Sequence, residues 1–234
     1  MSLPVLRGVV FDMDGTLVDS EAVYVGALRH ALGALGLPVR DAFCHRVTGL
    51  PGPAVHASIR EEYGEDFPFG VFSALYFARR DELAGEGIPL KPGAREILDH
   101  VSALGCPVGL ATSAQRAPAL ATLGRLHILR HFHVVVTRED VERTKPAPDL
   151  FLLACQALSV PPGETLAIED SINGVLAALA AGMPTVMVPD MAVPTAELRA
   201  RCHAVCRDLD EVRSLLPSVS PHLPSRAGSG IEEA

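Results

Sequence analysis

Short apolar runs alternate with amphipathic helical patterns along most of this chain, and this alternation restricts the possible folds more than any other feature. Apolar runs of this length, bounded by turn residues, are typical of buried strands. We predict strands at residues 5–11, 107–111, 133–136, 165–168 and 185–188, with a weaker one at 204–205, and helices at 94–104, about 115–123, 149–158 and 172–181. Strand–helix alternation predicts an α/β fold with a doubly wound parallel sheet.

The alternation is interrupted once, between residues 19 and 88, where every pattern is helical. Helical patterns cover residues 21–37, 53–63 and 69–83, and the first has a single apolar face. A block of about 70 residues is far longer than an ordinary connection between a strand and a helix. We therefore predict a Rossmann-like core of residues 1–18 and 89–217 with an inserted α-helical cap of residues 19–88. Residues 218–234 have the composition of a disordered tail.

The composition excludes several classes of function. The chain has 234 residues, of which 48% are hydrophobic, so it can bury a substantial core. A net charge of −8 argues against nucleic acid or an anionic membrane as a partner. The longest apolar region, residues 174–188, is interrupted by Gly182 and Pro184 and is too short to span a bilayer. With no basic and apolar leader and an odd number of cysteines, five, we expect a cytoplasmic protein with reduced thiols. The sequence does not predict an oligomeric state.

Two carboxylates stand where the first predicted strand ends. Asp12 and Asp14 follow a buried apolar run, and Gly15 permits a sharp turn directly after them. In an open α/β sheet, ligands bind beyond the carboxyl ends of the strands. Adjacent carboxylates repel each other and resist burial, so an Asp-rich turn is the simpler interpretation only if nothing else converges there. A divalent cation would relieve the repulsion, and one carboxylate could then act as a nucleophile.

Two further strands end in polar side chains at the same edge of the sheet. Thr112 and Ser113 follow the second strand, where hydroxyl and backbone N–H groups suit a phosphate oxygen. Glu169 and Asp170 form a second acidic pair at the end of the fourth strand, although a helix N-cap would also explain them.

Lysine usage adds to this pattern. The chain has eighteen arginines but only two lysines, so a lysine in this background favours a site where a compact ammonium is wanted. Lys145 lies in a proline-rich loop just before a predicted helix, whereas Lys91 lies in a turn where we expect a solvated charge.

Taken in order, these four segments resemble those of the haloacid dehalogenase superfamily. They read Asp-x-Asp-Gly-Thr-x-x-Asp-Ser from Asp12, a strand ending in Thr-Ser, Lys-Pro-x-Pro-Asp from Lys145, and Glu-Asp-Ser-x-x-Gly from Glu169. The pattern is similar to the branch with a helical cap inserted after the first motif, which contains sugar-phosphate phosphatases and β-phosphoglucomutases. The resemblance covers roughly residues 5–215 and implies a phosphoric monoester hydrolase.

The resemblance also implies a role for each motif residue. Asp12 would attack the substrate phosphorus and become an aspartyl phosphate, and Asp14 would act as general acid and then general base. Mg²⁺ would be held by Asp12, the backbone carbonyl of Asp14 and Asp170, with Glu169 nearby. Residues Thr112, Ser113 and Lys145 would bind the transferring phosphoryl group. Mg²⁺ prefers oxygen ligands, and phosphoryl transfer depends mainly on positioning and charge neutralisation.

Substrate choice is expected to lie in the cap. Arg46, Thr48 and Gly49 occupy the position of a substrate loop in relatives, and Arg79 and Arg80 are a second candidate that would otherwise be a solvated helix face. A small covered pocket suits a phosphorylated metabolite, such as a sugar phosphate or a nucleotide-like compound, and excludes proteins and polynucleotides.

Three other functions compete with a phosphatase. A haloalkanoate dehalogenase does not carry the second acid, so Asp14 argues against it, and an inactive binding module is disfavoured because every motif residue is present. The stronger rival is a phosphomutase of the β-phosphoglucomutase type. Such mutases have a histidine at the position of Tyr24, which here resembles phosphatase members instead. We therefore favour the phosphatase and keep the mutase as the alternative.

Overall fold

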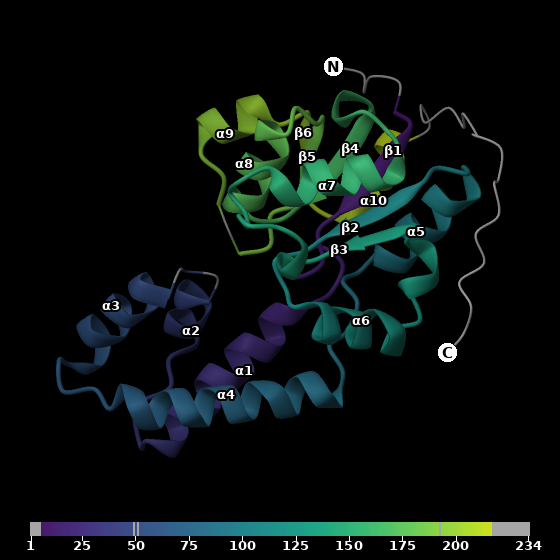
Figure 1. Ribbon diagram of the computed structural model, residues 1–234. Helices are drawn as coiled ribbons and strands as arrows, with labels where there is room; N and C mark the ends of the chain where they lie inside the picture. Colours follow the sequence, from purple (N-terminus) through teal and green to yellow (C-terminus); the bar gives the residue numbers. More distant parts are fainter. Residues whose placement is uncertain (1–5, 49, 51, 192, 217–234) are drawn as a thin grey trace.

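A computed structural model describes residues 6–48, 50, 52–191 and 193–216 of the chain. Its centre is one parallel sheet of six strands in the order β3-β2-β1-β4-β5-β6 (Figure 1). The strands are β1 (Gly8–Phe11), β2 (Val108–Ala111), β3 (Val134–Val136), β4 (Thr165–Glu169), β5 (Thr185–Met187) and β6 (Ala204–Val205). This order confirms the predicted doubly wound α/β fold, and the chain reverses direction across the sheet between β1 and β4.

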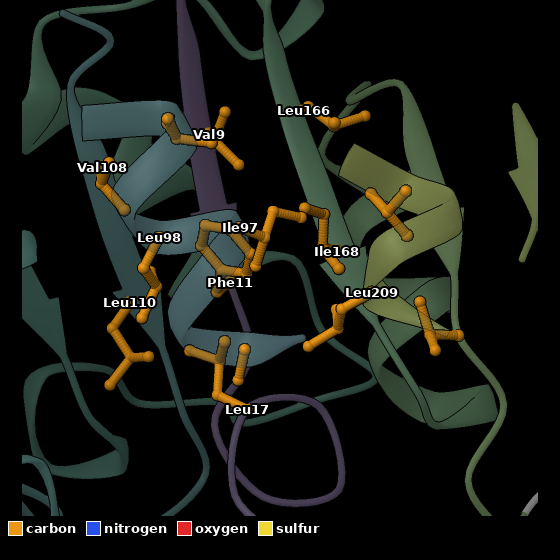
Figure 2. Packing of buried hydrophobic residues seen from close by; sticks show 14 of the residues in the cluster. Val9, Phe11, Leu17, Ile97, Leu98, Val108, Leu110, Leu166, Ile168 and Leu209 are labelled. Atoms are coloured by element: carbon orange, nitrogen blue, oxygen red, sulfur yellow. The ribbon is translucent and has the colours of Figure 1, made fainter. Parts of the chain in front are cut away.

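Helices cover both faces of the sheet because side chains alternate between its faces along each strand. Val9 and Phe11 of β1 pack in one apolar cluster, while Val10 packs in another. The first cluster includes α5 (Ala94–Ala103), α6 (Arg116–Arg125) and α10 (Leu209–Leu215), and the second includes α7 (Asp149–Leu158) and α8 (Ile172–Ala180). Figure 2 shows Phe11 close to Ile97 of α5 in the first cluster. On the α8 side, α9 (Ala196–Arg201) packs against β5.

Four helices between β1 and β2 lie apart from the sheet (Figure 1). They are α1 (Ser20–Ala34), α2 (Asp41–Val47), α3 (Gly52–Tyr63) and α4 (Phe69–Glu86). They have an apolar cluster of their own, which includes Leu32, Phe43 and Ile59. This inserted helical layer agrees with the predicted fold class, while the exact boundaries of residues 19 and 88 stay a prediction.

The two connections to the helical layer run side by side. The backbone N–H of Asp19 donates to the carbonyl of Pro89 (2.8 Å), and that of Lys91 donates to the carbonyl of Leu17 (2.9 Å). Val18 and Leu90 form an isolated antiparallel bridge between them. The point where the chain leaves the sheet layer is therefore hydrogen-bonded to the point where it returns.

Several element boundaries differ from the sequence predictions. Helix α1 ends at Ala34 rather than residue 37, because the chain turns at Gly36 with a positive φ of 70°. Helix α4 continues beyond residue 83 to Glu86. The short helices α2, α9 and α10 were not predicted. The predicted tail at residues 218–234 lies outside the described residues. Among the described helices, none combines the length and apolarity that crossing a membrane requires.

Candidate active site

The strand order brings Asp12 and Glu169 together at the carboxyl edge of the sheet. Asp12 follows β1 directly, and Glu169 is the last residue of the neighbouring strand β4. Phe11 pairs with Ile168 in the strand register, and the backbone N–H of Asp12 donates to the Ile168 carbonyl (3.0 Å). The two carboxylates therefore lie at the place where the strand order reverses, which is where open α/β sheets bind ligands.

Lys145 joins these two carboxylates. Its Nζ donates to Asp12 Oδ1 (2.5 Å) and to Glu169 Oε1 (2.7 Å), and it lies 5.0 Å from the centre of the Phe151 ring. The side chains of Lys145, Asp12 and Glu169 are only 6%, 8% and 1% exposed. Burial on its own lowers the pKa of Lys145, but the charges of Asp12 and Glu169 outweigh it and raise the pKa. The ammonium is therefore held charged in a nearly dry site.

Three buried carboxylates form one group that we call the acid cluster: Asp12, Glu169 and Asp170. Each offers an oxygen within 4.8 Å of the oxygens from the other two. Burial raises the pKa of Asp12 to about 7, although Lys145 acts in the opposite direction. Burial, together with the charges of Glu169 and Asp12, raises the pKa of Asp170 well above its ordinary range. The single ammonium of Lys145 cannot neutralise three carboxylates, so the acid cluster has excess negative charge when all three are ionised.

The acid cluster fits a small divalent cation. Its oxygen-only donor set is the kind that Mg²⁺ prefers. Burial first, and then repulsion between the acids, raises the pKa values of Asp12 and Asp170, and a cation would offset both effects.

Two glycines make the close approach of these acids possible. Gly15 has a positive φ of 83°, and a Cβ there would lie 2.4 Å from Asp170 Oδ2. In helix α8, a Cβ on Gly174 would lie 1.7 Å from Glu169 Oε1. Any larger residue at either position would collide with a carboxylate of the acid cluster. At Gly15, glycine also permits the turn that the sequence predicts.

Hydroxyl groups hold the acids in place. Thr16 Oγ1 donates to Asp170 Oδ1 (2.9 Å), and the backbone N–H and hydroxyl of Ser171 donate to Glu169 Oε2 (2.7 and 2.9 Å). Ser171, rather than Glu169 or Asp170, caps α8 by accepting from the N–H of Gly174. A helix cap therefore does not explain the second acidic pair.

The roles of Thr16 and Ser171 were missed at the level of sequence, although both residues lie inside the quoted motifs and could have been found there.

Asp14 is separate from the acid cluster. It lines a cavity of about 300 Å³, which we call the site cleft, together with Ser20, Tyr24, Arg80 and Arg125 among others. Burial raises the pKa of Asp14, while a hydrogen bond with Ser20 and the charge of Lys145 act against it. Burial thus stabilises the protonated form of this carboxyl group relative to water, beside a space that can hold a ligand.

Thr112 and Ser113 follow β2, the other neighbour of β1. Thr112 is buried, and its Oγ1 accepts a hydrogen bond from the N–H of Ala114 (3.0 Å). Ser113 is exposed. The structure brings both residues to the edge that carries Asp12, but in the described part of the chain no hydrogen bond links either hydroxyl to the acid cluster.

The predicted cap residues are separated in the structure. Thr48 lines a second cavity of about 380 Å³ among the cap helices, which we call the cap cavity. Arg46 instead lies over the Phe43 ring and beside Glu62, with 60% of its side chain exposed. Arg80 lines the site cleft. Gly49 lies outside the described residues.

The expectation that Lys91 is a solvated turn charge was wrong. Its Nζ donates to Asp190 Oδ1 (2.5 Å), and the two side chains are 21% and 10% exposed. Asp190 follows β5 and is 99 residues away in sequence, so no local pattern could have indicated the pair. The pair ties the returning connection from the cap helices to the edge of the sheet.

Comparisons with known proteins agree with this geometry. The sequence model of the haloacid dehalogenase-like hydrolase family matches residues 9–188. A phosphorylated carbohydrates phosphatase of Thermotoga maritima is 32% identical over 76% of this chain and 82% of its own length. A phosphoglycolate phosphatase of Escherichia coli is 33% identical over 77% of this chain and 80% of its own length. A hydrolase structure of the same family from Deinococcus radiodurans, with bound phosphate and sodium, has a TM-score of 0.80 at 27% identity and covers 93% of this chain and 99% of its own.

Proposed function

The chain belongs to the haloacid dehalogenase-like hydrolases, and from that premise we propose that it is a Mg²⁺-dependent phosphatase acting on a small phosphate monoester through an aspartyl phosphate on Asp12. The observation that carries the proposal is the Lys145 ammonium between Asp12 and Glu169 within the acid cluster. The related phosphatases named for phosphorylated carbohydrates and phosphoglycolate support a phosphorylated metabolite as substrate.

In the first half of the reaction, an Asp12 carboxylate oxygen forms a bond to phosphorus while the bond from phosphorus to the leaving oxygen breaks. Lys145, close to Asp12, reduces the repulsion between this carboxylate and the phosphoryl oxygens. Asp14, protonated and facing the site cleft, donates its proton to the leaving oxygen, and the alcohol departs. Thr112 and Ser113 would donate to the phosphoryl group from the end of β2.

In the second half, Asp14 is a carboxylate and takes a proton from the attacking water. The water oxygen bonds to phosphorus, the acyl phosphate bond breaks, and Asp12 is again a carboxylate. Inorganic phosphate leaves, and Asp14 carries the proton needed for the next cycle.

Residues Asp12 and Asp170, with the backbone carbonyl of Asp14, would hold Mg²⁺, and Glu169 lies beside them. When bound, Mg²⁺ supplies positive charge against the negative charge of the nucleophile and the phosphoryl group. Glu169 keeps Lys145 and Ser171 in position by accepting hydrogen bonds through both of its oxygens.

Residues 1–18 and 89–217 would act as the catalytic core and residues 19–88 as a cap that selects the substrate. Tyr24 supports hydrolysis over phosphoryl exchange, because the resemblance places a histidine there in the mutases. Burial and the charge of Asp14 raise the pKa of Tyr24 to about 12, so it is a neutral phenol near pH 7. An uncharged residue at this point cannot couple closure of the cap to protonation near neutral pH.

Phosphate release from a panel of phosphorylated metabolites tests the function. We expect turnover with Mg²⁺, loss of turnover when a chelator removes it, and restoration on adding it back. Asp12→Asn is nearly isosteric and should lower kcat by at least about a thousandfold, or about 4 kcal/mol, with an unchanged melting temperature.

Asp66→Asn, at an exposed cap position, is the matched control and should keep full activity. Activity of Asp12→Asn within about tenfold of the parent would exclude the covalent mechanism. Conversion of glucose 1-phosphate to glucose 6-phosphate faster than phosphate release would establish the mutase instead.

A further inference from the structure

The site cleft and the cap cavity lie one after the other along helices α1 and α4. Tyr24 of α1 lines both. One turn further along α1, Leu28 lines only the cap cavity, and on α4 Arg80 lines the site cleft while Tyr76 lines the cap cavity. Figure 1 shows these two helices side by side below the sheet. Because one helical turn rises about 5.4 Å, a ligand in the site cleft needs only a short extension past Tyr24 to enter the cap cavity.

The cap cavity is predominantly apolar. Its described lining contains no Asp, Glu, Lys or Arg, and its apolar and aromatic members are Tyr24, Leu28, Val47, Leu50, Val55, Phe72, Tyr76 and Phe77. Its polar side chains are Thr48, His56 and Ser73, together with the hydroxyls of Tyr24 and Tyr76. The Thr48 hydroxyl already donates to the carbonyl of Cys44 (2.7 Å). A polyol has more hydroxyl groups than these few polar side chains can satisfy, which costs free energy, whereas a hydrocarbon group gains from leaving water.

The site cleft is lined by charged side chains of both signs. Arg80 and Arg125 bring two positive charges to its lining, but Asp14 and Asp81 bring two negative ones. Arg80 donates to Asp81 Oδ1 through Nε (2.9 Å) and Nη2 (2.6 Å), so its charge is already compensated.

We propose that the alcohol part of the substrate carries an apolar group, either an alkyl chain or an aromatic ring, that occupies the cap cavity while the phosphate lies at Asp12. This inference rests on the proposed phosphatase function and specifies its substrate class. Tyr24 lies at the junction between the site cleft, which contains charged side chains, and the cap cavity, which contains no Asp, Glu, Lys or Arg in its described lining. A cavity of about 380 Å³ has room for roughly thirteen non-hydrogen atoms, if each takes about 30 Å³ as a water molecule does in the liquid.

A homologous series of n-alkyl phosphates from ethyl to hexyl tests the proposal. With Mg²⁺ present, kcat/KM should rise about three- to fourfold for each methylene that enters the cap cavity, which is the factor expected from burying one CH₂. Hexyl phosphate should exceed a six-carbon sugar phosphate by at least about tenfold, since the cavity offers the sugar hydroxyls few partners. A flat series, or a preference for the sugar phosphate or for phosphoglycolate, would overturn the proposal.

Calorimetric binding of the matching alkyl phosphonates, which cannot be hydrolysed, separates this proposal from the proposed function. Affinity that rises with chain length in an enzyme without turnover would support the cap cavity and reject the phosphatase. If the enzyme turns over but neither the affinity nor kcat/KM depends on chain length, the apolar substrate is rejected and the phosphatase function is kept.

Two neighbouring variants on α4 locate the effect. Ser73 lines the cap cavity, so Ser73→Phe fills it and should reduce the hexyl-to-ethyl ratio of kcat/KM to within about threefold of one. Ala74 is exposed and does not line the cavity, so Ala74→Phe should keep the parent ratio. Equal ratios in both variants would place the chain-length dependence elsewhere and contradict the proposal, and thermal unfolding verifies that both variants are folded.

Discussion

The carboxyl edge of the sheet and the helical layer use their polar side chains in opposite ways. At the sheet edge, Asp12 and Glu169 are at most 8% exposed, and Lys145 contacts both. Among the helices, Arg46 is 60% exposed and its partner Glu62 also binds Arg40. The space enclosed by these helices is lined mainly by apolar groups instead.

The difference indicates which region tolerates change. Contacts at the sheet edge are so close that two glycines are required to admit the carboxylates, so almost any displacement there alters the chemistry. The helical layer encloses empty volume, and side chains that line it can change size without moving the acid cluster. We therefore expect large losses from changes at the sheet edge and small or substrate-dependent ones from changes in the helical layer.

The largest effect is expected from Gly174→Ala. The new Cβ would overlap the Glu169 carboxylate, which must then leave Lys145 and Ser171. We expect kcat/KM to fall about a thousandfold, or about 4 kcal/mol, together with a lower melting temperature. Gly124→Ala is the control, since a Cβ on this α6 residue meets nothing within 4 Å and should slightly stabilise the helix. Full activity of Gly174→Ala would show that the sheet edge is as tolerant as the cap.

The two lysines sharpen the comparison within the sheet edge. Lys145→Arg keeps the charge but places a planar, larger head group between two buried carboxylates, so we expect kcat/KM to fall at least about a hundredfold, or about 3 kcal/mol. Lys91→Arg is the matched variant, and because its partner Asp190 lies outside the acid cluster, the loss should stay within about fivefold. Steady-state kinetics on one substrate measures both, and equal effects would mean that the ammonium of Lys145 is not special.

A cap substitution should have a much smaller effect. Arg46→Ala removes a guanidinium that is held by Glu62 and the Phe43 ring, so we expect KM to change less than about threefold. Arg60→Ala is a close control, because Arg60 also lies over an aromatic ring, that of Phe69, beside a surface acid, Glu65. If Arg46→Ala alone raised KM tenfold or more, the predicted role of residue 46 in substrate binding would stand.

The smallest effect on turnover is expected at Asp140, which ends the 3₁₀ turn η2 (Arg138–Asp140) after β3. Arg116 and the backbone and hydroxyl of Thr137 donate to its carboxylate, and chiefly the Arg116 hydrogen bond lowers its pKa. Asp140→Asn should lower the free energy of unfolding by about 1 kcal/mol at pH 7 without changing kcat.

Because the folded-state pKa of Asp140 is lowered, its stabilisation is present above about pH 4 and is lost as the pH falls through the folded-state value. Urea unfolding of parent and variant at pH 7 and pH 3 measures this, and the difference between the two proteins should narrow at pH 3. A constant difference at both pH values would mean that the charge of Asp140 does not contribute.

The sheet and the acid cluster were predictable because both follow from local patterns. Continuous apolar runs predict strands that are buried on both faces, and α7 begins at Asp149 and ends at Leu158 as predicted, since two prolines precede it. Asp12 and Glu169 are each the first polar residue beyond such a run, and Asp170 follows Glu169, so the parallel topology is enough to bring these acids together.

The features that the sequence did not predict are short helices and contacts between residues that are distant in the sequence. Helix α2 has 7 residues and α9 has 6, too few for a clear periodicity. The Lys91–Asp190 pair joins segments with no shared motif. Arg46 lies away from the cavities because it packs over the ring of Phe43, which belongs to the helical cluster. The sequence spacing that suggests a substrate loop does not reveal this packing.

The paired connections at Val18 and Leu90 have a consequence for how such a protein can diversify. Because the chain leaves at Val18 and returns at its hydrogen-bonded neighbour Leu90, the two connections can hold inserts of different size, while the crossover through α5 to β2 stays the same. The entropy of closing a loop grows only slowly with its length, so an insert of a different size changes the stability of the sheet little. Duplication followed by replacement of the inserted helices could therefore redirect an ancestor to new compounds while its reaction chemistry is inherited unchanged.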